Sequence, residues 1–284
     1  MTDQTPVWFI TAAASGFGKA MALEALSRGH KVIASGRYMS RLVDLETAGA
    51  DIMVLEVCSP LSDIETVAEE ANAKYGYITH LVNVAGYVLV GAVEETSPEQ
   101  DLRAFTTNVL GTLNVTKAFL PHLRATPGHR TISNFGSVVS WQGGPGSAIY
   151  VGTKWAVSGI SESLRAELAP FGINVMVIEP GWFRTGILGK GVPVYSEKSL
   201  GVYEDVGRLR EMLGEVDGKQ VGDTGKACRV AVDVLTRCGC GEGKDVPIRL
   251  VLGRDAFEVI GEKCRATLRL LGEWEGVVGD TDYD

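Results

Sequence analysis

The stretch that decides the fold is Val7-Trp-Phe-Ile-Thr11-Ala-Ala-Ala-Ser15-Gly16-Phe-Gly18, followed by apolar residues at helical spacing (Met21, Ala22, Ala25 and Leu26). It reads as a short apolar strand, a turn of small residues and the start of a helix. At a helix N-terminus, free N–H groups and the helix dipole favour an anion, and small residues let a phosphate approach the backbone. The stretch therefore predicts a phosphate-binding turn formed by Ala12, Ser15, Gly16, Phe17 and Gly18.

Further strands alternate with helical segments along the chain. Apolar runs predict strands at Val7–Thr11, Lys31–Ser35, Ile52–Glu56, His80–Val84, Thr131–Phe135, Asn174–Ile178 and Pro247–Leu250. Such alternation is typical of a parallel sheet with helices on both faces. We therefore expect an α/β fold with a doubly wound, Rossmann-like parallel sheet, forming a single domain over residues 1–284.

Two segments depart from this pattern. Residues 186–223 are interrupted by glycines and contain one amphipathic piece, Tyr203–Leu213. Such an insertion is usually either a lid or a disordered excursion, and we expect a lid over the substrate. Residues 255–284 predict a C-terminal helix and an acidic tail that frays from Gly276. The helix carries an apolar stripe that predicts either core packing or a subunit interface (Ala256, Val259, Ile260, Leu268 and Leu271).

Composition limits the classes of function. With 45% hydrophobic and 22% charged residues, the chain is typical of folded globular proteins. A net charge of −8 argues against nucleic acid as a partner. Between Gly16 and Leu42, however, five bases stand against one acid, which favours a small ligand that carries phosphates. Many of the 35 glycines follow residue 180, where they predict mobility.

The sequence gives no sign of a membrane span, a secretory signal or a metal centre. It contains no apolar run of about 18 residues and no basic N-terminal segment followed by an apolar one, so we expect a cytoplasmic protein. Five cysteines are an odd number, which argues against a disulfide framework. The four histidines are scattered, so we expect them to be surface or structural residues and no metal to bind.

A second group of residues has the spacing needed for acid–base chemistry. Tyr150 and Lys154 are four residues apart in a predicted helix and therefore share one face. Ser137 follows the strand Thr131–Phe135, at the edge where parallel sheets present their site residues. A tyrosine has a pKa of about 10, and proton transfer near neutrality needs that pKa to fall by about 2–3 units. A neighbouring ammonium has the right sign to lower it.

Together these motifs resemble the short-chain dehydrogenase/reductase family over residues 7 to 185. The turn resembles the family's Thr-Gly-x-x-x-Gly-x-Gly, with Ala12 in place of the first glycine, and Asn83-Val-Ala85-Gly86 resembles its Asn-Asn-Ala-Gly. The family's catalytic tetrad is matched in order and spacing by Asn108, Ser137, Tyr150 and Lys154. The resemblance implies an enzyme that moves a hydride between a nicotinamide cofactor and a carbonyl carbon.

The resemblance also implies a role for each residue. Tyr150 gives or takes the proton of the substrate oxygen. Lys154 lowers the pKa of the phenol and binds the nicotinamide ribose, Ser137 orients the substrate oxygen, and Asn108 supports a proton relay. The expected cofactor contacts beyond the turn, Tyr150 and Lys154 are Arg37, Glu56, Val57, Asn83, Ala85, Gly86, Pro180, Gly181, Phe183 and Thr185.

The second strand indicates which cofactor is used. It ends in Gly36-Arg37, where a carboxylate would accept the 2′-hydroxyl of NAD. A guanidinium at this place suits a 2′-phosphate instead, so we expect NADP(H).

The substrate is less well defined. Trp141, Trp182, Phe183 and Tyr87 are either core residues or the lining of a pocket, and a pocket would imply a sizeable, apolar ketone or secondary alcohol, as in secondary-metabolite or steroid- and retinoid-like metabolism. A non-redox epimerase, isomerase or dehydratase and an NADP-sensing regulatory protein are the alternatives. The family implies a homodimer or homotetramer, formed through the helices that carry Asn108 and Tyr150.

Overall fold

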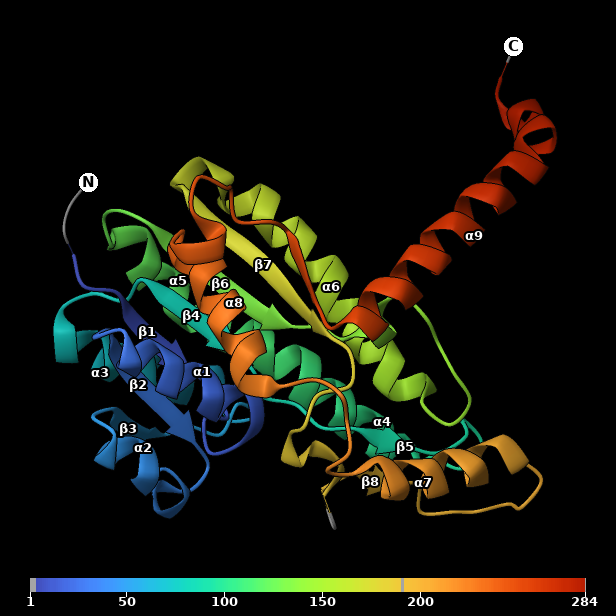
Figure 1. The fold of residues 1–284 in the computed structure, drawn as a ribbon, viewed down its shortest axis with the longest axis horizontal. Helices are drawn as coiled ribbons and strands as arrows, with labels where there is room; N and C mark the ends of the chain where they lie inside the picture. Colours follow the sequence, from blue (N-terminus) through green and yellow to red (C-terminus); the bar gives the residue numbers. More distant parts are fainter. Residues whose placement is uncertain (1–3, 190–191, 284) are drawn as a thin grey trace.

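The centre of the structure is a seven-stranded parallel sheet in the order β3-β2-β1-β4-β6-β7-β9 (Figure 1). A computed structural model describes residues 4–189 and 192–283. The strands are β1 (Val7–Ile10), β2 (Lys31–Gly36), β3 (Asp51–Val54), β4 (His80–Asn83), β6 (Arg130–Phe135), β7 (Ile173–Pro180) and β9 (Arg249–Leu252). The prediction of a single-domain, Rossmann-like α/β fold is confirmed, and each predicted strand is present with its ends shifted by up to two residues.

Helices cover both faces of the sheet. One face packs against α1 (Gly16–Ser27) and α8 (Thr224–Thr236), and the other against α3 (Leu61–Tyr75), α5 (Gly111–Ala125) and α6 (Ala148–Leu168). The remaining helices are α2 (Val43–Thr47), α4 (Pro98–Phe105), α7 (Glu204–Val216) and α9 (Arg254–Val278). Strand β1 shows why both faces are needed, since Trp8 and Ile10 enter one core while Val7 and Phe9 enter the other.

The segment that we expected to be a lid contains regular structure. A parallel pair of two-residue strands, β5 (Leu89–Val90) and β8 (Val194–Tyr195), is joined to α7, whose Val206 and Leu213 are buried. The buried Glu95 carboxylate accepts the N–H groups of Ala92 (3.1 Å) and Leu200 (2.8 Å). The glycine content alone had suggested mobility here, but these contacts hold residues 192–216 against the body.

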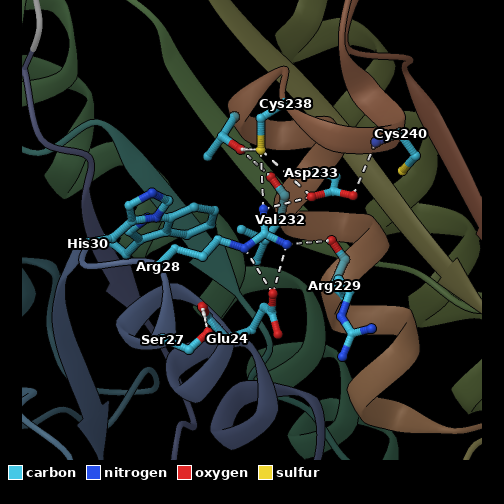
Figure 2. Close-up of polar contacts among 11 residues, drawn as sticks. Glu24, Ser27, Arg28, His30, Arg229, Val232, Asp233, Cys238 and Cys240 are labelled. Carbon is cyan, nitrogen blue, oxygen red and sulfur yellow. Dashed lines mark hydrogen bonds and ion pairs between the residues drawn. The ribbon is translucent and has the colours of Figure 1, made fainter.

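The C-terminal end of α1 is joined to α8 by Arg28, the residue that caps the helix (Figure 2). Arg28 donates to Glu24 of its own helix (2.7 Å) and to Asp233 of α8 (2.7 Å). All three side chains are less than one-fifth exposed. Cys238 Sγ lies 3.2 Å from the same guanidinium, and the chain's five cysteines are free thiols.

This arrangement corrects one expectation about the local excess of bases. Arg28 is engaged in the ion pairs just described, and Lys31 begins β2 at the amino edge of the sheet, opposite the phosphate-binding turn. Lys19 pairs with Asp44 at 2.6 Å. Of the five bases, Lys31, Arg37 and Arg41 make no ion pair among residues 4–189 and 192–283. Because Lys31 lies at the other edge, Arg37 and Arg41 are the two unpaired bases of this group that follow the carboxyl end of β2.

The C-terminal segment also differs from its prediction. The expected fraying begins at Gly276, but α9 continues to Val278 and is followed by a short 3₁₀ turn, η7 (Gly279–Thr281). The predicted stripe divides in two, since Ala256 and Ile260 are buried whereas Leu268 and Leu271 are more than 60% exposed. No helix among the described residues has the length and apolar character needed to cross a membrane.

Candidate active site

The turn between β1 and α1 has the backbone of an anion cradle. Gly16 has φ +53°, and a Cβ built on Gly18 would lie 2.6 Å from the Ala12 carbonyl oxygen, so both positions require glycine. The first turn of α1 carries no acidic side chain, and the Ser15 hydroxyl makes no capping hydrogen bond. The N–H groups at this helix end are therefore available to a phosphate.

Ala12 stands where the family's turn has its first glycine, and it adopts a glycine-like backbone conformation. It has φ +50°, one of two non-glycine residues with positive φ in the described part of the chain. The left-handed conformation costs an L-residue about 1–2 kcal/mol. The predicted turn is thus retained at the expense of backbone strain.

Two neighbouring segments support the turn. Thr11 Oγ1 accepts the N–H groups of Val84 (2.9 Å) and Ala85 (3.2 Å), which joins the end of β4 to the turn. On the other side, the Phe183 ring packs on Phe17 with 5.3 Å between centroids. These contacts place the predicted cofactor segments beside one another.

The predicted catalytic side chains converge at the carboxyl edge of the sheet. Tyr150 and Lys154 share one face of α6, as expected, with Lys154 Nζ 5.9 Å from the centroid of the Tyr150 ring. Lys154 donates to the Phe135 carbonyl (2.7 Å) at the end of β6. Ser137, two residues after β6, lies close enough to the Tyr150 hydroxyl to lower its pKa. A hydroxyl, a phenol and a buried amine therefore form one group.

The pKa values of this group differ from the expectation that the Lys154 ammonium lowers the pKa of the Tyr150 phenol. Burial raises the pKa of Tyr150 to about 12, and Ser137 offsets only part of that rise. Burial lowers the pKa of Lys154 to about 8. The amine lies over the ring and binds a carbonyl, so Ser137 is the protein group that lowers the pKa of the phenol, by less than burial raises it. A further positive charge is needed at the site to bring that pKa below its ordinary value.

Asn108 lies in a π-helical segment, η2 (Thr106–Leu110), between α4 and α5. Its Oδ1 accepts the Tyr87 N–H, and its Nδ2 donates to the Tyr87 carbonyl and to Thr153 Oγ1, at 3.0–3.1 Å. Thr153 in turn donates to the Tyr150 carbonyl (2.7 Å). A Cβ built on Gly86 would lie 3.1 Å from Asn108 Oδ1 and 3.7 Å from Lys154 Nζ, so Gly86 allows this close approach.

Other predicted cofactor residues are placed as follows. Arg37 and Glu56 are exposed, and Glu56 accepts the Cys58 N–H (3.2 Å). Val57 is buried against the start of α5. The Asn83 side chain is directed away from the turn, toward Thr116 and Asn134, so only its backbone faces a ligand at the carboxyl edge. Thr185 lies over Gly16, with its Cβ 3.4 Å from where a Gly16 Cβ would be.

Sequence reasoning missed two acids that hold the site together. Buried Glu179 accepts from Trp141 Nε1 (2.8 Å) and Ser158 and pairs with Arg249, which anchors the segment after Ser137. Burial raises the pKa of Glu179 despite these contacts. Of the aromatic residues considered as pocket lining, Trp141 is half-buried and held by Glu179, and Phe183 is buried against Phe17. The sequence offered one sign of Glu179, since it is an acidic residue directly after the apolar run 174–178.

The second acid is Asp255 in the first turn of α9. Its Oδ2 accepts the Trp182 N–H (2.7 Å), and a Cβ built on Gly181 would collide with the carboxylate. Asp255 therefore fixes the Pro180–Gly181–Trp182 turn. The signal was a short polar side chain three residues after a strand, at the edge where sites form.

Comparison with known proteins agrees with this geometry. The sequence profile of the family described as short chain dehydrogenase matches residues 6–193. This chain is a member of the short-chain dehydrogenase family. The short-chain dehydrogenase of Streptomyces avermitilis has the same fold, with a TM-score of 0.87 and 35% identity over 99% of this chain and 100% of that one.

Curated relatives of this short-chain dehydrogenase are named as oxidoreductases. Oxidoreductase BOA17 of Botryotinia fuckeliana is 35% identical over 265 residues, which cover 91% of this chain and 92% of the relative. Oxidoreductase calM of Penicillium decumbens is 34% identical over 273 residues, covering 92% and 88%. The protein is therefore an oxidoreductase of a family that uses nicotinamide cofactors.

The strain at Ala12 yields a stability prediction. Ala12→Gly should raise the free energy of unfolding by about 0.5–1 kcal/mol, because glycine adopts positive φ without a steric penalty. Ala14→Gly, in the same turn but without positive φ, should lower it. Urea denaturation of both variants measures the difference. Equal effects would show that Ala12 is not strained.

Proposed function

We propose that this short-chain dehydrogenase interconverts a ketone and a secondary alcohol on an apolar small molecule, with NADP(H) as its cofactor. The observation that carries the proposal is the group formed by Ser137, Tyr150 and Lys154 beside the α1 turn. A carbonyl oxygen that meets the Tyr150 hydroxyl would lie next to a hydrogen-bond donor and a proton source at once.

The chain fits a dinucleotide at this edge. Glycines at 16, 18 and 86 leave room for close backbone approach, and the N-terminus of α1 offers unpaired N–H groups. Arg37 would bind the 2′-phosphate, Glu56 and Val57 would flank the adenine, and Thr185 would hold the carboxamide. When bound, the nicotinamide supplies or accepts the hydride and, when oxidised, a positive charge.

The protein's own residues would manage the proton. In the reducing direction the Tyr150 hydroxyl donates its proton to the substrate oxygen as the carbonyl carbon is reduced, and Ser137 stabilises the charge that develops on that oxygen. The Lys154 ammonium favours the resulting phenolate. Because the Asn108 carboxamide is committed to Tyr87 and Thr153, a relay toward Lys154 would use the Asn108 main-chain carbonyl, which accepts from Thr112 (3.1 Å).

The lid supports an apolar substrate. Val206 of α7 and the neighbouring Leu209 approach Gly146, where a Cβ would lie 3.1–3.2 Å from their methyl groups. Gly146 is four residues before Tyr150, so α7 brings aliphatic side chains close to the reacting group. An exposed Trp182 on the opposite segment adds a further apolar surface.

We also propose a homo-oligomer formed through α5 and α6. These helices leave an apolar groove between them on the outer face, lined by Leu113, Leu120, Ile160 and Leu164. Such a groove suits the same pair of helices of a second copy.

Removal of the phenol tests the reaction. Tyr150→Phe should lower kcat for carbonyl reduction by about 10²–10⁴-fold, the usual contribution of one acid–base group. NADPH affinity, measured by fluorescence titration, should change little, and Tyr38→Phe at an exposed site serves as the control. Turnover retained by Tyr150→Phe would contradict the proposal. Substrate conversion without net NADPH oxidation would favour a non-redox isomerase or dehydratase, and tight NADPH binding without turnover of any carbonyl would favour a sensor.

The cofactor preference is tested at Arg37. Arg37→Asp should lower the ratio of kcat/KM for NADPH to that for NADH at least tenfold, because a carboxylate repels the 2′-phosphate and accepts a 2′-hydroxyl. Lys31→Asp makes the same charge change at the opposite edge of the sheet and should leave the ratio unaltered. An unchanged ratio in Arg37→Asp would refute this assignment.

The lowered pKa of Lys154 predicts that activity and stability change in opposite directions as the pH rises. Above about pH 8 the ammonium loses its proton, so kcat/KM for reduction should fall. Stability should rise over the same interval, up to about pH 10, because the unfolded chain binds the proton more tightly than the folded one. Rate profiles and thermal midpoints measured together separate the two effects. In Lys154→Arg the alkaline decline should disappear, and a decline that persists at the same pH would exclude Lys154 as its source.

A further inference from the structure

The C-terminal helix extends beyond the body of the protein (Figure 1). α9 has 25 residues, yet its buried side chains are Ala256 and Ile260, both in the first two turns. Every side chain described from Glu262 to Gly279 is exposed. At 1.5 Å per residue, this uncovered part is about 27 Å long.

This uncovered part is rich in large apolar side chains. An isolated helix of this length is only marginally stable in water, and exposed apolar patches of this size mark interaction surfaces. Those more than half exposed are Leu268, Leu270, Leu271, Trp274, Val277 and Val278. The helix therefore needs a partner that covers it.

The spacing of the apolar residues identifies the kind of partner. In the uncovered part, residues 264, 267, 271, 274 and 278 are separated alternately by three and four positions. These are the a and d positions of two heptads, occupied by Cys, Thr, Leu, Trp and Val. Such a seam fits another helix, packed side by side.

The charges on the helix identify its orientation. Residues 262–270, before Leu271, carry three bases and one acid, whereas residues 272–282, after it, carry four acids and no base. In an antiparallel pair of identical helices centred near Leu271, the basic part of one helix runs along the acidic part of the other. A parallel pair would place like charges together.

We propose that the outer part of α9 pairs in antiparallel fashion with α9 of a second copy of this chain. The contact is separate from the groove between α5 and α6, so it joins two monomers or two dimers. A lipid surface is the less suitable occupant, because acids outnumber bases five to three between Glu262 and Asp282, and anionic membranes attract bases.

Sedimentation velocity of the full chain tests the pairing. Leu271→Glu should halve the mass of the assembly at a concentration where the wild type is fully associated. Ala266→Glu adds the same charge on the opposite face of the helix and should leave the mass unchanged. Both variants should keep wild-type oxidoreductase activity, since the two positions are exposed and distant from Tyr150 in the sequence. An assembly of the same mass in Leu271→Glu would overturn the proposal.

A lipid partner would give a different result. Co-sedimentation with phosphatidylcholine vesicles, with and without phosphatidylserine, that is lost in Leu271→Glu while the mass in solution stays constant would replace the second copy with a membrane. The pairing is supported if the wild type co-sediments with neither kind of vesicle and Leu271→Glu halves the mass of the assembly.

Cys264 provides a test of orientation. It lies in the seam seven residues before Leu271, so the antiparallel pair places it opposite position 278 of the partner. Val278→Cys should form a disulfide with Cys264 of the other copy under copper–phenanthroline, identified by peptide mass spectrometry. The wild type should form none between the two Cys264 residues. A Cys264–Cys264 disulfide would show a parallel pair and overturn the antiparallel arrangement.

Discussion

The constraint on which the structure depends is that all seven strands of the main sheet run in the same direction. Every carboxyl end then lies at one edge, and each following loop begins there. The turn after β1, the Ser137 segment after β6, the Gly181 turn after β7 and Asp255 after β9 are brought together for this reason alone. Residues separated by more than two hundred positions in the chain thus share one site without any dedicated scaffold.

Burial sets the chemistry at that edge. The Lys154 amine is held against a backbone carbonyl, and the Tyr150 phenol lies beside Ser137, both in surroundings that disfavour charge. Protein groups alone leave the proton on the phenol and weaken the hold of the amine on its own proton. The protein therefore lacks the positive charge that would lower the pKa of Tyr150, and the site suits a ligand that carries such a charge.

The sequence predicted what depends on local patterns. Strand positions, the turn of small residues between β1 and α1, and the shared face of Tyr150 and Lys154 each follow from spacing within a short segment, and the structure has all three. Glu179, Asp255 and Glu95 could not be found in this way, because each binds partners distant in sequence (Trp141 and Arg249, Trp182, Leu200). Residues 192–216 illustrate the same limit, since glycine content predicted mobility whereas the buried Glu95 carboxylate holds the segment against the body. Likewise, the basic residues near the turn could be counted but not assigned to sheet edges until the topology was known.

The attachment of α9 through Asp255 has a geometric consequence. The helix is joined to the Gly181 turn at its first residues, whereas its other end lies farthest from the body of the molecule (Figure 1). A second copy paired along the outer part of α9 would therefore be oriented by a helix that is anchored at the Gly181 turn, so the contact through Asp255 would set the angle between the two carboxyl edges.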